Sequence, residues 1–163
     1  MLTITRAEPE DADAILALQK LAFQSEAKLY DDGSIPPLVQ DVESLLQEFS
    51  TSVVLKTLVA DEIVGSVRAH ARAGVCRVGR LIVHPAFQGR GIGTNLLRAI
   101  EDCFKGVAAF ELFTGTKSEG NIRLYQRHGY AIVRTEQLSP AVSIVFLAKP
   151  ACERRSGSTG EGS

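Results

Sequence analysis

The chain has 163 residues, of which 45% are hydrophobic and 23% are charged. This balance is typical of a globular domain and excludes a disordered chain, a collagen and a disulfide-stabilised miniprotein. No apolar run approaches the roughly 20 residues of a membrane-spanning helix, and the first residues lack the pattern of a secretory signal. We therefore expect a cytoplasmic protein without a membrane partner. Residues 1–149 would form a single domain, and the Gly/Ser-rich residues 150–163 a disordered tail.

The net charge of −1 hides an uneven distribution along the chain. Residues 1–50 hold three basic and ten acidic side chains, a net charge of −7, whereas residues 51–149 hold 13 basic and seven acidic ones, a net charge of +6. A basic second part favours an anionic ligand, although ordinary solvated charges would give the same balance. Because the basic residues are scattered and aromatic residues make up 6% of the chain, no nucleic acid partner is expected.

The three cysteines, Cys76, Cys103 and Cys152, lie far apart in the sequence. No C-x-x-C pair and no Cys/His cluster occurs, so we expect neither a disulfide framework nor a metal site. Cys76 and Cys103 have apolar neighbours and are predicted to be small core residues.

Hydrophobic periodicity predicts the elements in chain order. Alternating or β-branched runs predict strands over residues 2–6, 52–60, 63–69, 75–83, 107–114, 130–137 and 142–148. Apolar residues at helical spacing predict helices over about residues 9–22, 36–49, 94–105 and 118–128, the last with Ser118 as its N-cap. The early strands form a meander and the later ones alternate with helices. This order favours an α+β (mixed α/β) domain with helices on both faces of a sheet.

The segment Gln88-Gly89-Arg90-Gly91-Ile92-Gly93 follows a predicted strand and opens a predicted helix. Glycines at such a turn allow the backbone to approach a ligand closely, and the helix N-terminus favours a phosphate or pyrophosphate. A plain turn would not need three glycines in five residues. The segment fits neither the Gly-x-Gly-x-x-Gly dinucleotide pattern nor a P-loop, which requires Gly-Lys-Ser/Thr.

The stretch from Leu81-Ile82-Val83-His84-Pro85 through Gln88–Gly93 resembles motif A of the GCN5-related N-acetyltransferase (GNAT) superfamily. The family pattern is Gln or Arg, two residues, Gly, one residue, then Gly or Ala, and it is met by Gln88, Gly91 and Gly93. The block Asn121–Tyr130 resembles a second family segment, Asn-x-x-x-x-Tyr followed by Gly-Phe/Tyr. The resemblance extends over about residues 2–148. It implies a mostly antiparallel mixed sheet of about seven strands, splayed between the fourth and fifth.

The resemblance also implies that acetyl-CoA is the co-substrate. The turn would bind the pyrophosphate through backbone N–H groups, and the strand before it would pair with the pantetheine arm. Asn121 would bond the pantetheine or hold its helix. The implied cofactor-binding residues are Leu81, Ile82, Val83, Gln88, Gly89, Arg90, Gly91, Ile92, Gly93, Thr94, Asn121 and Tyr125.

For catalysis, the resemblance implies that a strand bulge aims the Val83 N–H at the thioester carbonyl, where it would stabilise developing negative charge. Tyr125 would protonate, or donate a hydrogen bond to, the departing thiolate; otherwise it is a core residue. The general base is open. Some family members carry a Glu on the fourth strand, but residues 75–81 contain no acid. Glu111, Glu26, a water chain and bulk solvent remain as alternatives.

The family's first two helices and their loop wall the acceptor side, and here this region holds Glu26, Tyr30, Asp31 and Asp32. We expect these acidic residues to favour a cationic primary amine. Arg77 and Arg80 argue for a carboxylate if they face the cleft, and Arg80 is included among the expected substrate-binding residues.

The predicted function is acetyl-CoA-dependent N-acetyl transfer to a primary amine of a small molecule or peptide, by direct attack of the amine on the thioester. The alternative is a non-catalytic module that senses acyl-CoA. The sequence leaves open whether the protein is a monomer or a homodimer.

Overall fold

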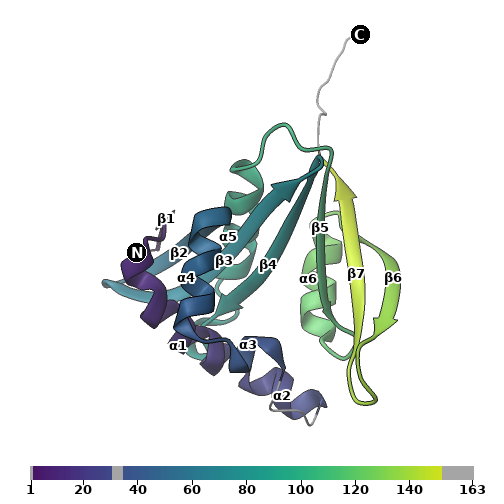
Figure 1. Ribbon diagram of the computed structural model, residues 1–163, viewed down its shortest axis with the longest axis horizontal. Coiled ribbons are helices and arrows are strands. Elements are labelled where there is room, and N and C mark those ends of the chain that lie inside the picture. The colour runs from purple at the N-terminus through teal and green to yellow at the C-terminus, as the bar shows by residue number, and fades with distance from the viewer. Residues whose placement is uncertain (1, 31–34, 152–163) are drawn as a thin grey trace.

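The structure, a computed structural model, describes residues 2–30 and 35–151, and in this part of the chain seven strands form one sheet (Figure 1). The sheet order is β1-β2-β3-β4-β5-β7-β6. The strands are β1 (Thr3–Arg6), β2 (Val53–Val59), β3 (Glu62–Arg72), β4 (Val75–Val83), β5 (Ala109–Gly115), β6 (Ala131–Gln137) and β7 (Ser143–Pro150). This seven-stranded sheet confirms the predicted fold class.

The sheet splits between its fourth and fifth strands. In the described part of the chain, neighbouring strands are antiparallel except β4 and β5, which are parallel and pair over residues 75–77 and 109–111. Beyond that short ladder the two strands diverge, as Figure 1 shows. The second half of β4 therefore has an edge that faces no neighbouring strand, which confirms the predicted splay.

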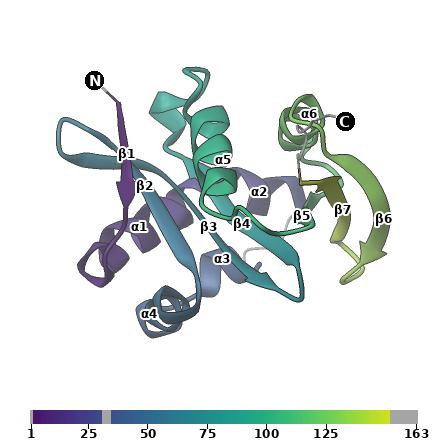
Figure 2. The ribbon, with the colours of Figure 1, turned by 90° about the horizontal axis from the view of Figure 1, so that it is seen from above.

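Helices cover both faces of the sheet (Figure 2). The helices are α1 (Ala12–Ala22), α2 (Gln24–Tyr30), α3 (Pro36–Val39), α4 (Val42–Thr51), α5 (Ile92–Asp102) and α6 (Glu119–Arg127). α1, α3 and α4 lie on one face, while α5 and α6 lie on the other. Within the described residues, no helix is long and apolar enough to span a membrane.

Each face has its own hydrophobic core. α5 is amphipathic and packs its buried side chains, among them Leu96, Leu97 and Ile100, onto the face of β3 and β4. On the opposite face Ile15 of α1 and Leu45 of α4 form a smaller cluster with Val54. Burial of this apolar area is the main force that holds the two layers of helices on the sheet.

Two helical segments differ from the sequence prediction. The predicted helix over residues 36–49 is broken at Gln40, whose backbone is extended (ψ 138°), and restarts after Asp41, whose carboxylate caps Ser44 N–H at 2.9 Å. The Gln40 side chain turns inward and contacts Gln19 and Glu48, which explains the break. Residues 24–30, expected at the end of the first helix and in a loop, form α2. The expected tail over residues 150–163 lies outside the described residues from residue 152 onward, while β7 continues through Pro150.

Candidate active site

The open edge of β4 is shaped by a β-bulge. The register between β3 and β4 shifts between Ser66 and Arg68, so that Arg80 and Leu81 together lie opposite one residue of β3. Arg80 has φ 51°, a left-handed conformation that is uncommon outside glycine and typical of bulges. Just beyond, His84 N–H donates to Val64 O at 2.8 Å. Because hydrogen bonds alternate along an antiparallel ladder, Val83 N–H points away from β3, toward the gap.

A glycine turn joins β4 to α5. Gly89 and Gly91 both have φ 80°, a conformation that strains any residue with a Cβ, and α5 begins at Ile92 directly after Gly91. No side chain caps this helix. The N–H groups of its first turn have no partner within the helix, and together with the helix dipole they create an environment that suits an anion.

The turn and the β4 edge line one cavity of about 510 Å³, here called the glycine-turn cavity. One side of the cavity is closed by residues of α1, of α2 and of the junction between them, namely Ala22, Glu26 and Phe23. The other side is closed by residues of α6. The cavity brings together most of the residues expected to bind coenzyme A: Leu81, Ile82, Val83, Gln88, Gly89, Gly91, Ile92, Gly93, Thr94 and Asn121. Arg90 is not among its lining residues, and the Arg90 guanidinium lies 5.0 Å from the centre of the Phe87 ring.

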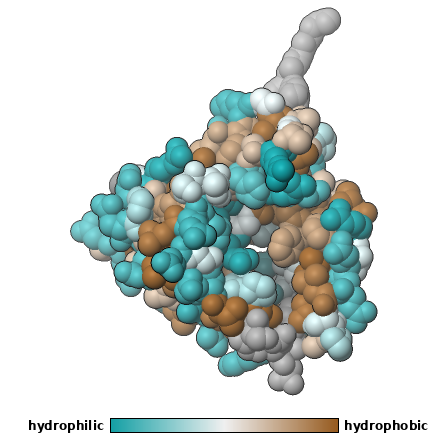
Figure 3. Space-filling model, viewed as in Figure 1, coloured by the Kyte–Doolittle hydropathy of each residue, from teal (hydrophilic) through white to brown (hydrophobic). Residues whose placement is uncertain are grey.

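A second cavity of about 400 Å³, the Tyr125 cavity, adjoins the first. Leu81, Asn121, Phe23 and Glu26 line both cavities, so these residues form the passage between them. The wall from β5 and β7 is largely apolar, and Figure 3 shows the opening as a hollow with hydrophobic surface along that side. The two cavities together could hold a ligand on each side of the β4 edge.

Tyr125 is 7% exposed, and its ring packs edge-on against Tyr130 at 6.0 Å between centroids. Its hydroxyl makes no hydrogen bond within the described part of the chain, although its side chain lines the Tyr125 cavity. Burial raises the pKa of the Tyr125 phenol, and the charge of Glu26 raises it further. The phenol therefore keeps its proton at neutral pH and can donate it.

Glu26 lies on α2 at the passage between the cavities. Its Oε1 accepts a hydrogen bond of 2.5 Å from the hydroxyl of Ser118, at the N-terminus of α6. Ser118 was expected to cap α6, but its side chain makes no capping bond and instead holds Glu26. Of the other residues expected on the acceptor side, Asp31, Asp32 and the side chain of Tyr30 lie outside the described residues.

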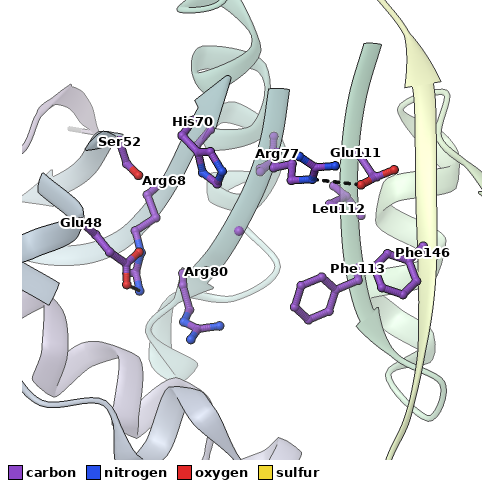
Figure 4. Close-up of a pocket in the computed structure, with 13 residues that line it drawn as sticks. Glu48, Ser52, Arg68, His70, Arg77, Arg80, Glu111, Leu112, Phe113 and Phe146 are labelled. Atoms are coloured by element: carbon purple, nitrogen blue, oxygen red, sulfur yellow. Dashed lines mark hydrogen bonds and ion pairs between the residues drawn. The ribbon is translucent and has the colours of Figure 1, made fainter. Parts of the chain in front are cut away.

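Glu111 and Arg77 form an ion pair, with Arg77 Nε 3.2 Å from Glu111 Oε1, where β4 and β5 begin to diverge (Figure 4). Glu111 lines a third cavity of about 310 Å³, the Glu111 cavity. It lines neither the glycine-turn cavity nor the Tyr125 cavity. The structure thus brings Glu26, rather than Glu111, together with Tyr125.

The sequence analysis missed a buried polar cluster beside the site. Arg68, 4% exposed, donates to Glu48, Gln19 and Gln40 over 2.6–3.1 Å, and so ties β3 to α1 and α4. The sequence does contain a signal for this cluster: Arg68 lies within the largely apolar run of residues 63–69, and a buried charge requires polar partners. Among the described residues, no group of three or more His, Cys, Asp or Glu side chains could hold a metal ion.

Comparison with solved structures supports the same fold. The ribosomal-protein-S18-alanine N-acetyltransferase of Escherichia coli superposes with a TM-score of 0.79 at 17% identity, covering 94% of this chain and 96% of that one. The PaiA N-acetyltransferase of Thermoplasma acidophilum, in complex with coenzyme A, gives 0.74 at 16% identity, covering 92% and 99%. A putative acetyltransferase from Salmonella typhimurium, with its cofactor acetyl-CoA, gives 0.72 at 19% identity, covering 95% and 96%.

A search of curated protein sequences found no significant match. A family model described as an acetyltransferase (GNAT) domain matches residues 53–132, which run from β2 through the glycine turn and α6 into β6. The family model and the seven-stranded splayed fold agree, and the chain belongs to the GCN5-related N-acetyltransferase superfamily.

Proposed function

We propose that this protein transfers the acetyl group of acetyl-CoA to a primary amine of a small molecule or peptide. The observation that carries the proposal is the contact of two cavities across the open edge of β4, one lined by the glycine turn and the other by Tyr125. Two proteins of similar fold, described with coenzyme A or acetyl-CoA, support the choice of co-substrate.

In this proposal the glycine turn and the first turn of α5 hold the pyrophosphate. Backbone N–H groups and the helix dipole suit its negative charge, and residues with φ 80° at Gly89 and Gly91 leave room for close approach. The unpaired edge of β4 pairs with the pantetheine amides in the manner of an added strand. Val83 N–H then faces the thioester carbonyl and stabilises the charge that develops on its oxygen.

The chemistry divides between Glu26 and Tyr125. The attacking amine gives up a proton to Glu26, directly or through one water, as the new C–N bond forms. The C–S bond breaks, and the departing thiolate takes the phenolic proton of Tyr125. A fixed donor and acceptor of this kind typically accelerate a reaction by about 10²–10⁴-fold each. We prefer Glu26 to Glu111 as the base because Glu26 lines the passage between the two cavities.

The test has two steps. Calorimetric titration with acetyl-CoA measures binding, and release of free thiol across a panel of primary amines measures transfer. We expect saturable binding and amine-dependent thiol release. A folded protein that fails to bind acetyl-CoA contradicts the proposal, and binding without transfer to any amine supports the alternative of a non-catalytic acyl-CoA sensor.

A further inference from the structure

Arg80 is a charged side chain without a partner in the wall of the acceptor side. Its Nε is buried and makes no hydrogen bond, and no ion pair of Arg80 is found within the described residues. It lines both the Glu111 cavity and the Tyr125 cavity, which also share Phe113 and Phe146. Buried polar atoms in native proteins nearly always have a partner, so an unpaired guanidinium beside a cavity is suited to an anionic group of a ligand.

The neighbouring carboxylates are already bound by other arginines. Arg68, on the adjacent strand, contacts both oxygens of Glu48, at 2.6 and 3.3 Å. Arg77 holds Glu111 at 3.2 Å. The carboxylates of the Glu111 cavity are therefore engaged, and Arg80 adds a positive charge that forms no ion pair within the described residues. Burial and the charge of Arg68 outweigh the opposing charge of Glu48 and lower the pKa of Arg80 to about 10, so the guanidinium is still protonated at neutral pH.

The opposite wall of the opening is aromatic. Figure 4 shows Arg80 extending from β4 into the gap, with Phe113 of β5 and Phe146 of β7 on the far side. Phe113 is 52% exposed although its side chain is large and apolar. The Arg134 guanidinium stacks on Phe146 at 3.7 Å from the ring centre and so holds that ring in place. A ligand with an apolar group would bury this surface.

Three charged side chains line the Tyr125 cavity: Arg80 on β4, Glu26 on α2 at the passage to the glycine-turn cavity, and Glu136 on β6. Glu136 is paired with Arg134 at 3.4 Å, so Arg80 and Glu26 are the opposite charges left at different places in the cavity. Resting on the proposed acetyl transfer, we propose that the acceptor is a free amino acid with an apolar side chain. Its carboxylate binds Arg80, its amine lies toward Glu26, and its side chain packs against Phe113 and Phe146. The planar fork of an arginine suits a carboxylate, whereas the N-terminal residue of a peptide presents a neutral amide at that point.

The experiment compares acceptors that share a side chain and an amine and differ in whether a free carboxylate stands beside the amine. Phenylalanine is set against phenethylamine, which lacks the carboxylate, against phenylalaninamide, which replaces it with a neutral amide, and against a tripeptide that begins with phenylalanine. Leucine and isoamylamine form a second pair. We expect kcat/KM to be about 30-fold or more higher for the free amino acids, as is typical when one partner of a desolvated charge pair is removed.

Variants of Arg80 locate the effect. Arg80→Gln should lower kcat/KM for phenylalanine by about 30-fold or more, chiefly through KM, and leave phenethylamine nearly unchanged. Arg80→Lys keeps the positive charge at the same backbone position, so kcat/KM for phenylalanine should fall less than in Arg80→Gln. Arg72→Gln is the matched control because Arg72 is exposed, lies at the end of β3 and lines neither cavity; its effect should stay within about threefold.

Binding of the product provides a readout that does not need turnover. With coenzyme A present, calorimetry should show tighter binding of N-acetylphenylalanine than of N-acetylphenethylamine, and Arg80→Gln should abolish the difference. Equal transfer to phenylalanine, its amide and phenethylamine, or a preference for the tripeptide, overturns the amino acid assignment but leaves acetyl transfer standing. Failure of the folded wild type to bind acetyl-CoA overturns both.

Discussion

Glu26 and Ser118, 92 residues apart in the sequence, are joined by a 2.5 Å hydrogen bond from the serine hydroxyl to Glu26 Oε1. The bond links α2, on one side of the split sheet, to the start of α6 on the other. It holds the carboxylate at the passage between the glycine-turn and Tyr125 cavities, close enough for its charge to raise the pKa of Tyr125. The position of the proposed base therefore depends on a side-chain contact between two helices.

Replacing Glu26 tests its role as the base. Glu26→Gln should lower the single-turnover rate of acetyl transfer by about 10²-fold or more and leave the affinity for acetyl-CoA little changed. Ser118→Ala should give a smaller loss, since it frees the carboxylate without removing it. Glu119→Gln, at an exposed neighbouring position, is the control. A wild-type rate for Glu26→Gln would assign proton removal to Glu111, a water chain or bulk solvent.

Replacing Tyr125 tests its role as the acid. Tyr125→Phe should lower kcat by about 10²–10⁴-fold with little change in KM for acetyl-CoA, because the hydroxyl acts when the thiolate departs. Rapid-mixing measurement of thiol release avoids masking by slow product release. Tyr130→Phe is the matched control: the Tyr130 hydroxyl donates to Glu101, near the C-terminal end of α5, at 2.7 Å, so its removal should lower stability but not the rate. Equal rates of thiol release for Tyr125→Phe and Tyr130→Phe would contradict the role as acid and show that Tyr125 is a core residue.

The glycine turn is tested with two glycines of the same backbone conformation. Gly91→Glu should abolish acetyl-CoA binding, because it places a side chain and a negative charge at the start of α5. Gly74, in the turn between β3 and β4, also has φ 80° and open space around it. Gly74→Glu therefore introduces similar backbone strain away from the cavity and should keep the wild-type affinity. Calorimetry on both folded variants decides the matter.

The polar cluster around Arg68 should contribute to stability. Glu48→Gln removes the countercharge of a guanidinium that is 5% exposed, and should lower the free energy of unfolding by about 2–3 kcal/mol. The effect should be smaller than for a fully buried pair, because the Glu48 side chain is 37% exposed. Urea unfolding measures the change, with the exposed Glu43→Gln on the same helix as the control. A change below about 1 kcal/mol would show that Gln19 and Gln40 suffice to hold Arg68.

The lowered pKa of the Asp11 carboxyl predicts how the free energy of unfolding depends on pH. Burial works to raise the pKa of this carboxyl, but the Glu8 N–H at 2.8 Å and Lys56 at 2.7 Å outweigh burial and lower the pKa. The unfolded state then binds the proton first, so the stabilisation is present at neutral pH and is lost as pH falls from about 3.9 through the folded value. The stability difference between wild type and Asp11→Asn should accordingly shrink in urea unfolding at pH 3. The exposed Asp13→Asn is the control, measured at pH 7 and at pH 3.

Much of the site could be identified from local sequence. The bounds of β4 follow from the apolar run between Gly74 and Pro85, and the glycine turn follows from residue types that tolerate φ 80°. Both depend on interactions within a few residues, which periodicity and turn chemistry describe well. These segments also resemble a motif of the superfamily, and the splayed sheet was predicted from that resemblance.

Contacts between distant segments were decided by the tertiary structure. Nothing local shows that Glu26 meets Ser118 or that the Gln40 side chain, at a break between two helices, contacts Arg68. Nor does local sequence show that Glu111 pairs with Arg77 away from the glycine-turn and Tyr125 cavities. From the sequence, Arg80 is an ordinary strand residue. In the structure it lies in the β-bulge of β4 and lines the Tyr125 cavity together with Phe113. Backbone conformation is set largely by neighbours along the chain. The pairing of charges is set by the packing of helices and strands that the chain brings together from far apart.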